Sequence, residues 1–100
     1  MSDVKVELPS GLAVLARLPR DVVVALAGPA TLGAVLDALE ADHPILRGTL
    51  RDAVSLRRRP FIRFFACQRD FSHCAMETLL PEAVTRGEEA FLVVGAIAGG

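Results

Sequence analysis

"TLGAVLDALEAD", residues 31–42, is the stretch that decides the fold of this 100-residue chain. Thr31 stands where a side-chain hydroxyl can accept a hydrogen bond from the first helical turn, and Pro44 lies just beyond the last apolar position. Between them, apolar residues recur at the i, i+3, i+4, i+7 spacing of one helical face: Leu32, Val35, Leu36 and Leu39. The pattern predicts an amphipathic helix that must bury one face against another layer.

Short β-type segments flank this helix on both sides. "VKVEL" (4–8) alternates apolar and polar residues, and "VVVAL" (22–26) is rich in β-branched side chains. The connection between them is expected to hold a short helical turn. After the helix, "PFIRFFAC" (60–67) alternates again, and its more uniformly apolar face, Ile62, Phe64 and Ala66, is expected to pack on the helix. In the last apolar run, residues 90–94, Phe91 and Val93 share one face and Leu92 and Val94 the other. The order strand, strand, helix, strand, strand predicts an α+β domain, with one main helix packed across a mixed sheet of four to five strands.

The amino-acid composition limits the classes of protein to which the chain can belong. Apolar residues make up 52% of the chain and charged residues 23%, which is typical of one globular domain. The start has no signal-peptide pattern and no apolar run is long enough to span a bilayer, so we expect a cytoplasmic protein with no membrane partner. Cys67 and Cys74 are then ordinary thiols, and with His43 and His73 they do not match a metal-ligand spacing.

The net charge of the whole chain is −1, but the segment between residues 47 and 69 is basic. A slightly acidic total argues against a nucleic-acid partner. A solvated basic loop and a docking surface for an acidic protein both remain open. The segment holds one acid, Asp52, and seven arginines: Arg47, Arg51, Arg57, Arg58, Arg59, Arg63 and Arg69.

Three segments in combination resemble the MoaD/ThiS family of small ubiquitin-like sulfur carriers. They are "ATLGAVLDALEADHP" (30–44), "VTRGEEAFLVV" (84–94) and "AIAGG" (96–100). The resemblance implies the β-grasp fold, with residues 1–94 as a single domain and residues 95–100 as a flexible tail. The "PFIRFFACQRDF" stretch is most similar to the branch associated with cysteine synthesis.

The resemblance implies a chemistry for the diglycine end. An ATP-dependent enzyme would adenylate the carboxylate of Gly100, and a sulfur nucleophile would displace AMP to leave a thiocarboxylate. Gly99 and Gly100 lack side chains that would clash in a narrow channel, and Ala96, Ile97 and Ala98 would thread behind them. The protein is then a substrate, not an enzyme. It binds no cofactor itself, because ATP belongs to the partner, and no metal or nucleophile–base motif stands out.

The same resemblance implies two partners, an adenylating enzyme and a sulfur-accepting biosynthetic enzyme, and a monomer when free. The acceptor sets the pathway, which could be molybdopterin, thiamine, cysteine or a specialised metabolite. We expect Phe65, Leu92 and Arg63 to form the interface with the activating enzyme, and the arginine segment to aid the encounter.

Two other functions remain open. A ubiquitin-like modifier would join Gly100 to lysines of other proteins. Lys5 is the only lysine in the chain, so chain-building on itself is nearly excluded. A β-grasp binding module with an idle tail is the third reading.

Overall fold

The computed structural model describes residues 2–95, and Met1 and residues 96–100 lie outside the described part. Within it, the sheet has five strands in the order β2-β1-β5-β3-β4. β1 and β5 run parallel, and the other paired strands run antiparallel. The elements are β1 (Ser2–Glu7), α1 (Ser10–Ala16), β2 (Asp21–Leu26), α2 (Leu32–Asp42), the 3₁₀ helix η1 (Pro44–Leu46), β3 (Ile62–Ala66), β4 (Arg69–Asp70), α3 (Glu82–Thr85) and β5 (Phe91–Gly95).

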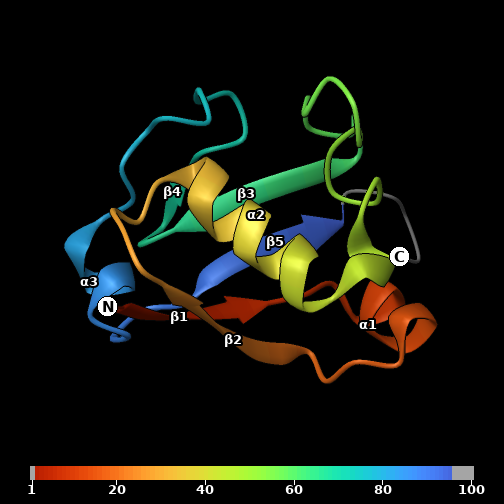
Figure 1. Cartoon of the computed structure of the whole chain (residues 1–100), viewed down its shortest axis with the longest axis horizontal. Coiled ribbons are helices and arrows are strands. Elements are labelled where there is room, and N and C mark those ends of the chain that lie inside the picture. The colour runs from red at the N-terminus through yellow and green to blue at the C-terminus, as the bar shows by residue number, and fades with distance from the viewer. Residues whose placement is uncertain (1, 96–100) are drawn as a thin grey trace.

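Helix α2 crosses one face of the sheet, and the short helices α1 and α3 lie at its ends (Figure 1). The first and last strands, β1 and β5, are neighbours near the middle of the sheet. This arrangement is the β-grasp fold that the sequence predicts, with one main helix and a mixed sheet. The α+β prediction is therefore confirmed.

The start of α2 is held by three separate hydrogen bonds. The Thr31 hydroxyl accepts from the Ala34 N–H at 3.0 Å, as the sequence predicts. The backbone N–H groups of Leu32 and Gly33 donate to the carbonyls of Thr78 and Met76, at 2.9 and 2.8 Å. These bonds satisfy donors that a helix start leaves unpaired, and they tie the 72–80 loop to the helix.

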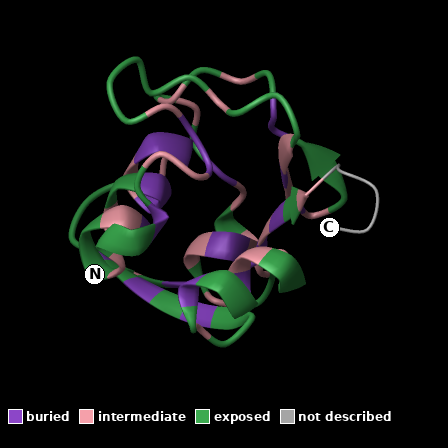
Figure 2. Ribbon diagram, turned by 90° about the vertical axis from the view of Figure 1, so that its right-hand side faces the viewer, coloured by how far each residue is buried: buried purple, intermediate pink, exposed green. Residues whose placement is uncertain are grey.

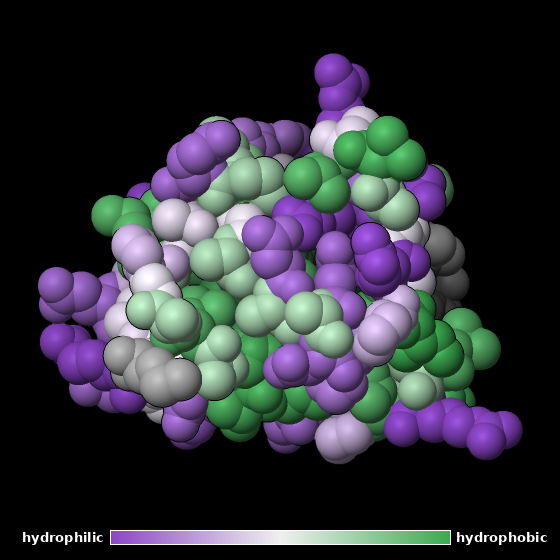
Figure 3. All heavy atoms as spheres, viewed as in Figure 1, coloured by the Kyte–Doolittle hydropathy of each residue, from purple (hydrophilic) through white to green (hydrophobic). Residues whose placement is uncertain are grey.

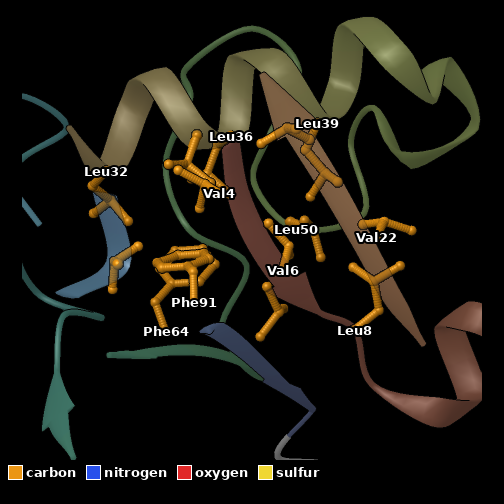
Figure 4. Close-up of a cluster of buried hydrophobic side chains, with 14 of the residues drawn as sticks. Val4, Val6, Leu8, Val22, Leu32, Leu36, Leu39, Leu50, Phe64 and Phe91 are labelled. Atoms are coloured by element: carbon orange, nitrogen blue, oxygen red, sulfur yellow. The ribbon is translucent and has the colours of Figure 1, made fainter. Parts of the chain in front are cut away.

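The core lies between α2 and the inner face of the sheet (Figure 4). Phe64 and Phe91 stack there with ring centroids 5.6 Å apart. Buried and exposed residues alternate along the strands, as a half-buried sheet requires (Figure 2). The inward side predicted for the third strand is confirmed, because Phe64 and Ala66 are buried.

The chain between η1 and β3 contains no helix or strand longer than a single bridge, and a buried arginine anchors it. Arg51 is 1% exposed and donates from Nε to the Glu40 carboxylate at 2.9 Å. Its guanidinium also binds Asp37, so two acids of α2 hold this segment. Burial would lower the pKa of Arg51, but the hydrogen bonds and charges of Glu40 and Asp37 outweigh it and hold that pKa above its ordinary value. Arg51 therefore stays charged inside the fold.

Two further arginines bind backbone carbonyls in the same region. Arg58 donates from Nε to the Ser72 carbonyl at 2.9 Å and from Nη1 to the Ile62 carbonyl at 2.7 Å. Arg59 donates from Nε to the Gly48 carbonyl at 2.8 Å. These contacts join the irregular segment to β3 and to the 72–80 loop.

The observed element boundaries differ from the predicted ones in three places. A short helical turn was predicted after the first strand, and α1 there is a helix of seven residues. The residues before β5 include α3, which the sequence did not predict. Gly95 was predicted to begin the tail but is the last residue of β5, paired with Ile62. None of the helices within residues 2–95 is long and apolar enough to cross a membrane.

Candidate functional site

Strand β5 leads directly to the predicted tail. It lies between β1 and β3, and pairing with both neighbours fixes its course through the sheet. The residues predicted to carry sulfur or to thread into the enzyme lie outside the described residues: Ala96, Ile97, Ala98, Gly99 and Gly100. The part of the candidate site that the structure describes is therefore the surface around the end of β5.

The outer face of β3 and β5 carries a small group of side chains that we call the sheet patch: Arg63, Phe65, Leu92 and Val94. Phe65 is paired with Leu92, and Arg63 with Val94, so these side chains share the face opposite the core. Three of the four are partly exposed, and Val94 is 40% exposed. The structure thus brings together the three predicted interface residues, Phe65, Leu92 and Arg63.

Val94 is a member of the patch that the prediction did not include. Its place two residues after Leu92 in an alternating strand was the available signal, since such residues share one face. With Val94 the apolar part of the patch extends along β5 to the last described residue, Gly95.

Carboxylates border the sheet patch, and two of them, Glu7 and Asp70, are paired with arginines. Glu7 on β1 pairs in register with Leu92. A hollow of about 390 Å³ beside Leu92 is lined by both Glu7 and Glu89. On the other side, Asp70 lies 3.6 Å from the Arg63 guanidinium. Among residues 2–95, no ion pair is found for Glu89. An apolar centre with this carboxylate at its edge is complementary to a partner surface that is apolar and carries a positive charge there.

Hydrogen bonds from Ser72 hold the pKa of Asp70 below its usual range, and the nearby Arg63 and His73 act in the same direction. A carboxyl with a lowered pKa in the folded state stabilises the fold above its unfolded pKa. That contribution is lost as the pH falls through the folded value. Asp70 therefore stays ionised at neutral pH and keeps its pairing with Arg63.

Most arginines of the basic segment make contacts within the fold. Arg51, Arg58 and Arg59 bind carboxylates or carbonyls within the fold, and Arg63 faces Asp70. Arg69 stacks over the ring of Phe71, with its Cζ 5.2 Å from the ring centroid. The structure thus gives most of these arginines a structural role that the sequence did not indicate.

The described residues offer little catalytic chemistry. Ser72 is buried, and its hydroxyl accepts a hydrogen bond from the Phe64 N–H at 2.9 Å. Cys67 and Cys74 are both half-buried free thiols. Within residues 2–95, no three His, Cys, Asp or Glu side chains are grouped closely enough to hold a metal ion.

An apolar groove lies beside Gly95, on the other side of the strand from the sheet patch. We call it the tail-root groove, and its volume is about 530 Å³. Leu15 and Phe61, two of its lining residues, are 80% and 58% exposed. Hydrophobic side chains gather over α1 on this side of the molecule (Figure 3). The groove is lined by Pro9, Gly11, Leu12, Leu15, Thr49, Arg59, Pro60, Phe61, Ile62 and Gly95.

Sequence reasoning did not find this groove. It requires α1 to be a full helix that places Leu12 and Leu15 on one side, three residues apart. It also requires the 59–62 segment to lie against that helix, which is a contact between residues far apart in the sequence. The exposed Phe61 was the only available signal.

Solved structures of other proteins share this fold. The chain resembles SAMP1 from Haloferax volcanii with a TM-score of 0.73 and 23% identity, over 98% of this chain and 99% of that one. It resembles CysO from Mycobacterium tuberculosis, described as an antigen, with a TM-score of 0.70 and 23% identity, over 94% of this chain and 99% of that one.

A chain in the crystal structure of the Amycolatopsis orientalis BexX/CysO complex gives a TM-score of 0.72 at 19% identity, over 97% of this chain and 99% of that one. At such identities the likeness establishes the fold. No protein-family model matches the chain, and no curated protein sequence matches it.

Proposed function

We propose that this protein is a ubiquitin-like sulfur carrier. The observation that carries the proposal is the combination of a β-grasp domain with the sequence "AIAGG", which follows directly on the last strand. The likeness of the whole chain to the CysO structures supports it, since the resemblance in the sequence points to the same class.

In the proposed reaction the tail is the reacting group, and the folded domain is the part that the partner enzyme binds. An ATP-dependent partner activates the Gly100 carboxylate, whose oxygen attacks the α-phosphate and releases pyrophosphate. A sulfur nucleophile then attacks the acyl carbon, AMP leaves, and the thiocarboxylate donates its sulfur to a biosynthetic enzyme. A carboxylate is ionised at neutral pH and is a poor electrophile, so activation is required.

The sheet patch is the proposed docking surface for the activating enzyme. Its residues Phe65, Leu92 and Val94 are apolar and partly exposed, and they lie on the strand that leads to the tail or beside it. Docking there would hold the tail near the reacting centre. A structure that pairs CysO with a second protein, BexX, supports the view that a carrier of this fold works in complex with a partner.

Intact-mass analysis tests the main proposal. The protein is incubated with ATP, a sulfide source and an adenylating enzyme, beside a variant that lacks Gly100. We expect a mass increase equal to exchanging one oxygen for sulfur, and no increase in the variant. No change in the full chain, with an enzyme shown to be active on another carrier, would contradict the proposal.

A protein modifier is the second candidate, because SAMP1 is described as a small archaeal modifier protein. The activated Gly100 would then form an isopeptide bond with a lysine of another protein. Lys5 lies exposed on β1 and is the only self-acceptor. Mass spectrometry of trypsin-digested lysate would show lysines bearing the tail remnant if the protein is a modifier, and their absence under several stresses would count against that function.

A further inference from the structure

We propose that the tail-root groove binds the chain's own C-terminal segment, residues 96–100, with Ile97 as the apolar anchor. The groove begins where the described chain ends, because Gly95 is one of its lining residues. The Gly95 backbone also lies against Pro9, another lining residue, so that a Cβ built there would be 3.6 Å from the Pro9 Cβ.

The alternation of β5 selects Ile97 over its neighbours. Phe91 and Val93 point into the core, whereas Leu92 and Val94 point to the outer face. Gly95 lines the groove, so odd-numbered positions face the side of the sheet on which the groove lies. An extended continuation of the strand would bring Ile97 to this side.

The length of the segment matches the groove. Two residues beyond Gly95 span at most about 7 Å. The Ile97 side chain therefore stays within reach of the residues that line the groove. Leu12, Leu15, Phe61 and Ile62 offer this side chain an apolar surface. An isoleucine between two alanines is a segment that such a groove can accommodate without a clash between bulky side chains.

Charge complementarity adds a second contact. Among residues 2–95, Arg59 is the only ionisable residue that lines the groove. Its Nε binds the Gly48 carbonyl, and among residues 2–95 no other hydrogen bond is found for its guanidinium. Ile62 pairs with Gly95, and the Ile62 N–H binds the Arg59 carbonyl. These two steps place the Arg59 Cα within about 12 Å of the Gly95 Cα, and five extended residues span about 18 Å.

This second contact rests on the proposed function, which places a reactive carboxylate on Gly100. That carboxylate would lie within reach of Arg59. The apolar contact of Ile97 stands without it. Docking is reversible because it costs the conformational entropy of the tail. The enzyme and the groove therefore compete for the same segment.

Amide NMR of the full chain against a variant that ends at Gly95 tests the proposal. We expect removal of residues 96–100 to shift the signals of Leu12, Leu15 and Phe61, independently of protein concentration. Ile97→Ser should reproduce most of these shifts, and Ala98→Ser only a small part. Shifts confined to the immediate neighbours of Gly95, or shifts of the sheet patch in place of the groove, would overturn the proposal.

Substitutions in α1 provide a matched pair. Leu15 lines the groove and is 80% exposed, whereas Val14 beside it is 77% exposed and does not line the groove. Both tolerate a polar residue without loss of the fold. Leu15→Ser should abolish the effect of tail removal on the Leu12 and Phe61 signals, and Val14→Ser should leave that effect intact.

Three further results would overturn the inference. Equal behaviour of the Leu15→Ser and Val14→Ser variants would do so, since the groove would then make no specific contact. Shifts that grow with protein concentration would indicate a second copy of the chain as the occupant. If tail removal does not shift the NMR signals of the groove residues, the groove does not bind the tail, and a partner protein is then the expected occupant. None of these results affects the mass test of sulfur transfer, so the two proposals fail separately.

Discussion

The two faces of the β3–β5 strand pair contain similar residues with different roles. Phe64 and Val93 face inward and are buried, whereas Phe65 and Leu92, their sequence neighbours, face outward and are partly exposed. Hydropathy alone does not separate the two sets. The inner set stabilises the fold through close packing, and the outer set is available for recognition. Substitutions in the two sets should therefore change different measured quantities.

The largest expected effect is on stability, from the inner face. Phe64→Ala removes the ring that stacks on Phe91 at 5.6 Å and leaves a cavity under α2. We expect the free energy of unfolding, measured by urea denaturation, to fall by about 3–5 kcal/mol. Phe65→Ala on the outer face should lower it by about 1 kcal/mol at most. Equal losses in the two variants would contradict the division between the faces.

The next effect is on partner binding, from the outer face. Phe65→Asp places a charge at the centre of the sheet patch, beside Leu92 and near the Glu89 carboxylate. We expect the rate of adenylation by the activating enzyme to fall about 30-fold or more, which corresponds to about 2 kcal/mol of lost binding. Denaturation with urea should show the fold intact.

Phe61→Asp is the matched control for this variant. Phe61 is a phenylalanine four residues earlier that is 58% exposed and lines the tail-root groove, away from the patch. Its substitution should not slow adenylation, because Phe61 lies outside the patch and weaker docking of the tail in the groove would only free that segment for the enzyme. A normal rate for Phe65→Asp, or an equal loss in both variants, would remove the sheet patch as the docking surface.

A smaller effect is expected from the carboxylate at the edge of the patch. Glu89 is exposed and lines the hollow next to Leu92. Glu89→Gln should slow association with a basic partner about two- to five-fold at low salt, and the difference should shrink as salt screens the charge. Glu77→Gln, an exposed acid on the 72–80 loop, serves as the control. A faster association of Glu89→Gln would mean that the docking partner is acidic.

Sequence patterns predicted the elements that depend on residues close together in the chain. The spacing from Leu32 to Leu39 and the Thr31 hydroxyl identified α2 and its start, because helix periodicity and capping depend on neighbours in sequence. Alternation identified the two faces of β3 and β5, and hence Phe65 beside Leu92. The diglycine resemblance added the β-grasp topology, which fixes the parallel pairing of β1 with β5.

Contacts between distant segments were not predictable in the same way. The roles of Arg51 and Arg58 depend on partners in α2 and in the 72–80 loop, and nothing in the sequence around them distinguishes an arginine bound within the fold from a solvated one. The tail-root groove likewise needs α1 and the 59–62 segment to meet. The sequence shows that these residues are present but not which distant residues they contact in the fold.

The smallest predicted effect lies at the turn that ends β3, which borders the hollow beside Leu92. Cys67 and Gln68 join β3 to β4 and both have positive φ, 50° and 65°, in the two-residue hairpin geometry that favours Asn-Gly. Gln68→Gly relieves the left-handed strain but increases the chain's freedom when unfolded. We expect a net gain of about 0.5 kcal/mol in the free energy of unfolding. Gln68→Ala retains a Cβ and should give no gain. Gln68 lines the edge of the hollow beside Leu92 but is not a patch residue, so adenylation should be little changed. A large loss of rate would extend the docking surface to the β3–β4 turn.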